Sequence, residues 1–153
     1  MASLEFPPVD GEKSSPNQNS INGKKYIFTD NSLRIKWAEF EFSGDIAKMK
    51  YENNTGVHEL IFGLGKYAEG IFPETHYYDK KIGLQAGRGF RYKASGAWFN
   101  PKSLTIYLYI IDNYFGTLKI NCYFENDTLT LHMNKVAEWF MDEYVGMATG
   151  FLE

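Results

Sequence analysis

The sequence contains little cysteine and no long apolar run, and both absences limit the kind of protein it can be. Its single cysteine, Cys122, cannot form a disulfide within the chain. A reducing compartment is therefore favoured. No stretch approaches the roughly 18 to 20 apolar residues that cross a bilayer as a helix, so we expect no membrane span. The N-terminus also lacks the charged-then-apolar order of a signal peptide.

Sequence motifs for common chemistries are missing too. The three histidines are far apart, with no H-x-H or H-E-x-x-H spacing, and one cysteine cannot build a zinc knuckle. There is no G-x-S-x-G elbow and no phosphate-binding loop of the G-x-x-x-x-G-K-[ST] type. The net charge of −3 gives no general attraction to a phosphate backbone. We therefore expect no metal, no cofactor and no nucleic-acid partner.

Aromatic residues, in contrast, are abundant, at 17% of the chain, and they favour the half-buried surface of a β-sheet. Ser43-Gly44-Asp45 and Asn53-Asn54-Thr55-Gly56 are typical of turns between consecutive antiparallel strands. Strand composition recurs around these turns over residues 25–29, 35–42, 46–52 and 57–62.

The second half of the chain has the clearest period of two, which is a strong strand signal. Asn126-Asp127 predicts a turn between two of these strands, and Cys122 falls in the apolar register, where packing is its expected role. Residues 63–97, with seven glycines, stay open, and residues 136–144 fit a short amphipathic helix. The apolar faces consist of Leu104, Ile106, Leu108 and Ile110, then Leu118, Ile120, Cys122 and Phe124, then Leu129, Leu131 and Met133.

Some eight to ten short strands separated by turns favour an all-β fold, either a sandwich or a closed up-and-down antiparallel barrel. We prefer the barrel because closure removes the edge strands. Residues 1–22 combine ends typical of a cloning site, Met1-Ala2-Ser3, with a linker rich in Pro, Ser and Asn. We expect a single barrel domain over residues 23–151, and residues 152–153 to belong to a tag.

Five short segments of the sequence occur in this order: Pro7-Pro8-Val9, Gly23-Lys24-Lys25-Tyr26, Phe42-Ser43-Gly44-Asp45, Gly63-Leu64-Gly65-Lys66-Tyr67 and Ala94-Ser95-Gly96-Ala97-Trp98. Together they resemble a known family, the non-catalytic C-terminal domain of bacterial serine hydrolases of the β-lactamase and penicillin-binding-protein type. The resemblance implies a lipocalin-like barrel attached by a linker to an upstream catalytic domain. The compartment stays undecided, with the bacterial cytoplasm favoured. The chain itself has no S-x-x-K, so it would be an accessory module without catalysis.

The alternative is a stand-alone lipocalin-like carrier of a small apolar or anionic ligand, since a small barrel either fills its interior with side chains or holds one ligand. For such a pocket, Trp98 is expected to stack on the ligand and Lys66 to pair with an anionic group. The ordinary structural interpretation of these residues stays open, and the many aromatics favour a filled interior. The candidate ligand-binding residues are Lys66, Glu69, Trp98, Tyr107 and Asp112.

A third hypothesis, an independent glycosidase or esterase, depends on one pair of carboxylates. Glu39 and Glu41 are two residues apart and would share one face of a strand, as the paired carboxylates of glycosidases on β-scaffolds do. The simpler interpretation is a solvated face, because Lys36, Lys48 and Lys50 lie on or near it. We therefore expect no enzymatic activity from this chain.

Overall fold

In the part of the chain that the structure describes, the protein is almost entirely β, with one short helix. The computed structural model describes residues 11–53, 56–72, 76–77, 80–81, 90–110, 116–136 and 145–153. The elements within these ranges are α1 (Gln18–Ile21), β1 (Lys25–Phe28), β2 (Trp37–Ser43), β3 (Ile46–Asn53), β4 (Gly56–Leu64), β5 (Ala68–Phe72), β6 (His76–Tyr77), β7 (Lys80–Lys81), β8 (Phe90–Asn100), β9 (Ser103–Ile110), β10 (Gly116–Glu125), β11 (Thr128–Val136) and β12 (Gly146–Leu152).

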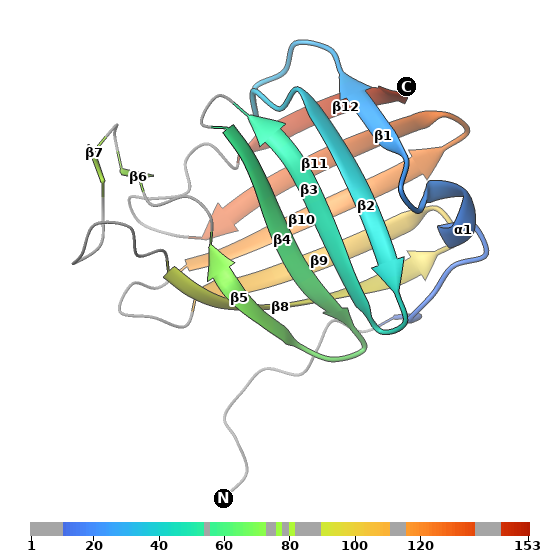
Figure 1. Ribbon diagram of the computed structural model, residues 1–153, viewed down its shortest axis with the longest axis horizontal. Coiled ribbons are helices and arrows are strands. Elements are labelled where there is room, and N and C mark those ends of the chain that lie inside the picture. Colours follow the sequence, from blue (N-terminus) through green and yellow to red (C-terminus); the bar gives the residue numbers. More distant parts are fainter. Residues whose placement is uncertain are drawn as a thin grey trace, which may run out of the picture.

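Nine of these strands form a closed barrel, and β5 lies outside the closed ring (Figure 1). The ladder runs β4-β3-β2-β1-β12-β11-β10-β9-β8 and closes through a parallel contact of β4 with β8. All other pairings are antiparallel, and the first and last barrel strands of the chain, β1 and β12, are neighbours. The expected all-β, lipocalin-like barrel of eight to ten strands is confirmed.

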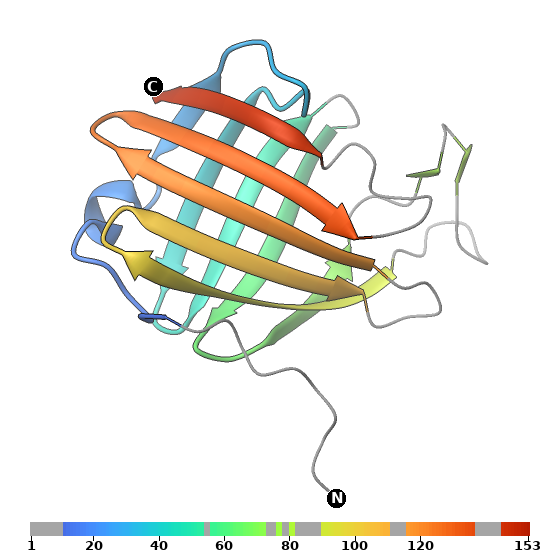
Figure 2. The same cartoon turned by 180° about the vertical axis from the view of Figure 1, so that it is seen from behind.

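Every strand of the closed ring runs between two ends of the barrel, which differ in the elements that lie there (Figures 1 and 2). We call the end that carries α1 and the β8–β9 and β10–β11 turns the helix end. The opposite end, where β3 and β11 stop and β8 and β12 start, is the far end. Because the ladders are antiparallel, the position of a residue along its strand gives its depth between these two ends.

The period-two pattern of the sequence corresponds to the inward and outward faces of the barrel. Leu118 and Ile120 on β10 are fully buried, and their ladder partners Leu108 and Ile106 on β9 are equally inaccessible. Since residues directly opposite each other on antiparallel strands share a face, these side chains form one continuous apolar interior. The predicted strand faces in the second half of the chain are therefore confirmed.

Two predicted turns take the backbone geometry that their residues suggest. Gly44 has a φ of 64° and Asn126 has a φ of 53°, in the left-handed region that Gly and Asn tolerate. The segment left open in the sequence, residues 63–97, contains most of β8, an eleven-residue strand with small residues at its centre. For the predicted helix over 136–144, β11 includes Val136, and residues 137–144 lie outside the described residues.

Residues 11–22, predicted to belong to a linker, contact the barrel. Glu12 exchanges two backbone hydrogen bonds with Trp98 of β8, at 2.9 and 2.8 Å. Ile21 of α1 is buried in the core. At the other end of the chain, Leu152 pairs with Tyr26 and packs against the core. Two predictions stay untested: that residues 1–22 include a linker to another domain, and that residues 152–153 belong to a tag.

The described part of the chain contains no helix long and apolar enough to cross a lipid bilayer.

Candidate functional site: the barrel interior and its far end

Aromatic rings fill the interior at the helix end. Phe124 lies at the centre of this group, with its ring centroid 5.4 Å from that of Phe40 and 5.9 Å from those of Tyr26 and Trp98. Phe42 packs on Trp98 at 6.0 Å. Tilted and edge-to-face pairs at such distances are favourable beyond the area that they bury. These rings therefore fill the described interior at the helix end.

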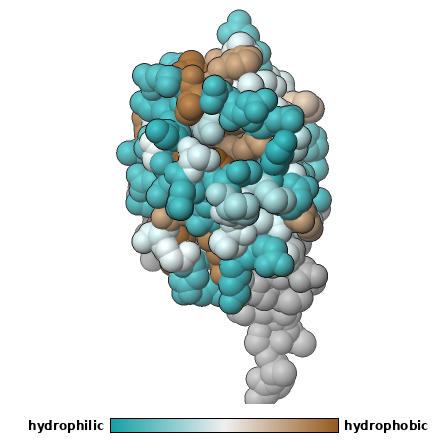
Figure 3. All heavy atoms as spheres, turned by 90° about the vertical axis from the view of Figure 1, so that its right-hand side faces the viewer, coloured by the Kyte–Doolittle hydropathy of each residue, from teal (hydrophilic) through white to brown (hydrophobic). Residues whose placement is uncertain are grey.

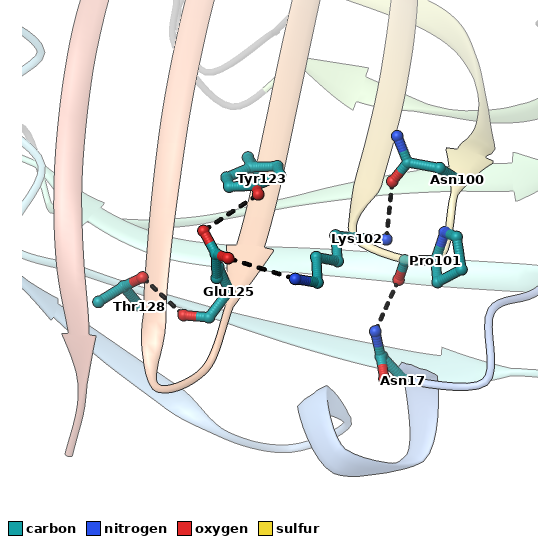
Figure 4. A network of polar contacts seen from close by, with 7 residues as sticks. All are labelled: Asn17, Asn100, Pro101, Lys102, Tyr123, Glu125 and Thr128. Atoms are coloured by element: carbon teal, nitrogen blue, oxygen red, sulfur yellow. Dashed lines mark hydrogen bonds and ion pairs between the residues drawn. The ribbon is translucent and has the colours of Figure 1, made fainter.

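Polar contacts fix the turns at the helix end to one another (Figure 4). The side-chain amide of Asn17 donates to the Pro101 carbonyl at 3.0 Å, and Lys102 pairs with Glu125 at 3.2 Å. The hydroxyl of Tyr123 also donates to Glu125, so Lys102 and then Tyr123 lower the pKa of this carboxyl. Seen from the side of the molecule that lies to the right in Figure 1, the surface is largely hydrophilic (Figure 3).

Further along the barrel, large rings pack against glycines. A Cβ atom on Gly96 would lie 2.8 Å from the Phe62 ring, and one on Gly150 would lie 2.9 Å from the Phe28 ring. Met49 and Leu118 expose none of their surface. The described apolar side chains of the interior are thus closely packed, and each of those in the core is at most 9% exposed. A ligand could enter only by moving some of them.

Two polar residues face inward at the far end, on β3 and β4. His58 lies directly opposite Tyr51, which is fully buried, and their rings are 5.5 Å apart. The His58 ring nitrogen Nε2 is 3.2 Å from Oδ1 of Asn53, whose side chain follows the inward register of β3 and is only 4% exposed. An imidazole and an amide therefore line this part of the interior wall.

A lysine faces inward on the opposite wall. Lys135 lies directly opposite Leu118 in the β10–β11 ladder, and it continues the inward register of Leu131 and Met133 toward the far end. Because side chains alternate between the two faces of a strand, its side chain starts on the interior face. Lys135 is half-buried, whereas Lys119 of β10 lies on the outer face, over the Tyr107 ring. Lys135 is the cation that the described strands present inward.

The remaining interior groups are poorly suited to chemistry. Burial strongly raises the pKa of the Cys122 thiol, so the reactive thiolate is not formed at neutral pH. Burial also raises the pKa of Tyr92, whose hydroxyl accepts a hydrogen bond from the Ile61 N–H. The buried thiol of Cys122 is consistent with its expected packing role, and the buried, hydrogen-bonded hydroxyl of Tyr92 is consistent with a structural role.

The structure places the predicted ligand residues in different environments. Lys66 lies in the β4–β5 turn at the helix end and pairs with Asp45 at 3.2 Å, and Glu69 is exposed on β5. Tyr107 lies on the outer face of β9 and stacks on Tyr109. Of the four predicted ligand residues that the structure describes, only Trp98 is in the core, where its Nε1 donates to Gln18 at 3.2 Å. Asp112 lies outside the described residues.

The carboxylates of the glycosidase hypothesis lie on the outer surface among lysines. Glu39 is opposite Lys50 in the β2–β3 ladder, and Glu41 is opposite Lys48. This arrangement matches the solvated face that we preferred for them. Among the described residues, no cluster of His, Cys, Asp and Glu could hold a metal ion.

Sequence reasoning did not single out Asn53, His58 and Lys135 as a set. A signal for Lys135 was present, because it is two residues after Met133 in a strand with a clear inward register. Asn53 and His58 lie at or next to a predicted turn, where the sequence does not show which side chains of the two strands face inward. Only the closed ladder reveals that all three residues face inward at one end.

The fold and its interior define a lipocalin-like barrel with an apolar core. Solved structures similar to it include fatty-acid-binding proteins. The Schistosoma mansoni protein, in complex with arachidonic acid, is 13% identical over 90% of this chain and 98% of its own, with a TM-score of 0.58. Echinococcus granulosus fatty-acid-binding protein 1 is 13% identical over 88% and 98%, with a TM-score of 0.56. The protein from Drosophila melanogaster brain tissue is 14% identical over 87% and 99%, with a TM-score of 0.52.

No protein-family model matches the sequence, and no curated protein is similar to it.

These neighbours overturn the hypothesis of an accessory domain from a β-lactamase-type hydrolase. The chain superposes over nearly its whole length on fatty-acid-binding barrels, and the serine-hydrolase terms gain no support. The resemblance was misleading for a physical reason. Two of its segments are turns that need glycine at positive φ, Gly44 and Gly65, and a third places Gly96 against a ring. Any tightly packed barrel makes similar demands, so these segments do not identify a family.

Proposed function

We propose that the protein binds a small amphipathic molecule, an apolar chain with an anionic head group, in the far half of its barrel. The observation that carries the proposal is the distribution of polarity along the interior. The described core is apolar from the aromatic group up to the middle of the barrel, and Asn53, His58 and Lys135 face inward only at the far end. An apolar site with a few convergent polar groups is typical of a small-ligand site.

The fold similarity supports the same class of ligand. The neighbouring proteins are described as binding fatty acids, and a carboxylate on a hydrocarbon chain complements a lysine above an apolar interior. The proposal is of binding without catalysis, in line with the neighbours. The role of Trp98 as a stacking residue stays a prediction, because Trp98 lies in the aromatic group at the helix end and not in the far half of the barrel.

The packed interior restricts the size of the ligand. Because the described core side chains leave little accessible surface, space for a ligand must come from side-chain rearrangement. Met49 and Met133 are the most adaptable residues for this, since an unbranched thioether fills irregular space at low cost. We therefore expect a short chain such as octanoate to bind more tightly than a long chain such as palmitate.

Calorimetric titration with octanoate tests the proposal. Wild-type protein is expected to bind it, and Lys135→Met is expected to weaken binding about 10-fold or more, since a hydrogen bond to a charged group contributes about 1.5–3 kcal/mol. Lys119→Met removes an outer-face lysine and serves as the matched control with unchanged affinity. The proposal would be contradicted if titration of the wild-type protein gave no heat of binding with either octanoate or palmitate, and if the two fatty acids did not compete for the protein. An equal loss of octanoate affinity in Lys135→Met and Lys119→Met would instead show that Lys135 is not part of the binding site.

A further inference from the structure

The wall of the barrel contains a seam between β4 and β5. β4 pairs with β8 only at Gly63 and Leu64, near the helix end. Beyond that point the edge of β8 pairs with β5, over residues 90–94 and 68–72. Within the described residues, no ladder joins β4 to β5, and the two strands diverge toward the far end (Figure 1). We define the seam by residues 57–62 of β4 and 69–71 of β5.

The edge of β4 that faces the seam has a backbone donor at Ile61. The N–H of Leu64 points toward the β3 side, where it donates to the Asp45 carbonyl at 2.7 Å. Successive N–H groups of a strand point to opposite edges, so the N–H of Ile61 points to the seam. There it donates to the hydroxyl of Tyr92 at 2.8 Å. A side chain thus provides the hydrogen bond that a neighbouring strand would normally provide.

Tyr92 reaches Ile61 by crossing β5. The residue belongs to β8, and its ladder partner on β5 is Gly70. A Cβ atom on Gly70 would lie 2.6 Å from the Tyr92 hydroxyl oxygen and 2.8 Å from Cζ, so only glycine lets the phenol lie across the strand. The Tyr92 side chain is 1% exposed. The ring therefore spans the seam from the inside and closes it.

The two ends of the seam are held differently. At the helix end, the β4–β8 ladder and the 3.2 Å ion pair of Lys66 with Asp45 fix the turn between β4 and β5. Toward the far end, Val57 on β4 and Ile71 on β5 are 54% and 58% exposed. Exposed apolar side chains thus lie on both strands that border the seam, where it is widest.

We propose that the β4–β5 seam is the path by which a ligand enters the packed interior, and that the Tyr92 hydroxyl bond to Ile61 is the latch that holds the path shut. Rotation of Tyr92 frees the Ile61 N–H and gives access to Leu60 and Phe62 on the inner face of β4. The entry path depends on the proposed ligand-binding function, but the latch itself does not.

Tyr92→Phe tests the latch, because it keeps the ring and removes the hydroxyl. Its matched control is Tyr123→Phe, which removes an outer-face hydroxyl bonded to Glu125. Amide hydrogen exchange by NMR is expected to rise about 10-fold at Ile61 in Tyr92→Phe, the equivalent of one hydrogen bond. Exchange at Leu60, whose N–H points to β3, should stay unchanged in both variants. Unchanged exchange at Ile61 would overturn the latch.

Stopped-flow binding of a dansylated short-chain fatty acid tests the entry path. Tyr92→Phe is expected to raise both the association and the dissociation rates several-fold, while Kd stays nearly constant, because the latch affects the route and not the bound state. Gly70→Ala, which displaces the phenol, should change the rates in the same direction. Unchanged rates with faster Ile61 exchange would overturn the entry path and leave the binding function standing. Failure of the wild-type protein to bind the probe would overturn the binding function, and the entry path with it.

Discussion

At the residue scale, the interior depends on a few large side chains in defined contacts. Phe124 touches the rings of Tyr26, Phe40 and Trp98 and is only 4% exposed, so its removal leaves a space that three neighbouring rings cannot easily fill. Phe99, the second-last residue of β8, is 62% exposed. The same amino acid therefore has opposite roles at these two positions.

Phe124→Ala is expected to lower the free energy of unfolding by about 3–5 kcal/mol, the cost of a large cavity in a packed core. Phe99→Ala should change it by no more than about 0.5 kcal/mol, as surface substitutions usually do. Urea unfolding followed by far-UV circular dichroism measures both. Similar losses in the two variants would show that the aromatic group at the helix end is not the main packing centre.

At the scale of the elements, the hairpins determine which residues of neighbouring strands face each other. The β10–β11 turn consists of two residues. The residues on either side of it, Glu125 and Thr128, pair directly with each other. Asn126 takes a φ of 53° in this turn. The hydroxyl of Thr128 also donates to the Glu125 carbonyl at 2.7 Å. The turn thereby fixes the register that brings Lys135 opposite Leu118.

Asn126→Val is expected to cost about 1–2 kcal/mol of unfolding free energy, because a β-branched residue at this φ is strained. Asn126→Gly has no such strain and is the matched control, with nearly unchanged stability. Thermal unfolding by calorimetry compares the two. A valine variant as stable as the glycine variant would mean that the turn has another backbone conformation in solution.

At the scale of the whole molecule, stability comes from the closed apolar interior and not from surface charges. The described ion pairs are exposed: in the pair of Lys66 with Asp45, the side chains are 50% and 59% accessible, and in that of Lys48 with Glu59 they are 37% and 42% accessible. Exposed pairs contribute little and are screened by salt. The Lys48 pKa is raised, first by its hydrogen bond to Glu59, but this pair lies at the solvent-accessible surface.

Raising the sodium chloride concentration to about 1 M, where the Debye length is about 3 Å, is therefore expected to shift the melting temperature by no more than about 4 °C. The measurement is a calorimetric scan at low and high salt. The Phe124→Ala variant at low salt provides the comparison, since loss of core packing should have a larger effect. A fall at high salt as large as that caused by Phe124→Ala would show that the ion pairs contribute far more than their exposure indicates.

Much of the architecture could be predicted from the sequence because it depends on local patterns. The alternation of Leu104, Ile106 and Leu108 predicts a strand with one buried face, and the structure confirms it. β8 could not be predicted in the same way. Its central Ala94-Ser95-Gly96-Ala97 has low strand propensity, and it becomes a strand because Gly96 makes room for Phe62 from another strand.

The site could be predicted only in part, because facing inward or outward depends on register. Trp98 was expected to stack on a ligand, which stays a prediction, and the structure shows only that its side chain lies in the core. Lys66 and Tyr107 lie away from the interior. A shift of one residue in register moves every side chain of a strand to the other face. Lys119 and Lys135 are the same amino acid on neighbouring strands, and only the strand pairing shows that the first faces outward and the second inward.

The sequence by itself determined the class of fold, the turns and the apolar character of the core, since each of these depends on residues close together in the chain. The tertiary structure alone decided which strands meet. It brings β1 beside β12, it ends the pairing of β4 with β8 after two residues, and it places Tyr92 across Gly70 to reach Ile61. These contacts join residues far apart in the chain, and they form only when the barrel closes and its interior is packed.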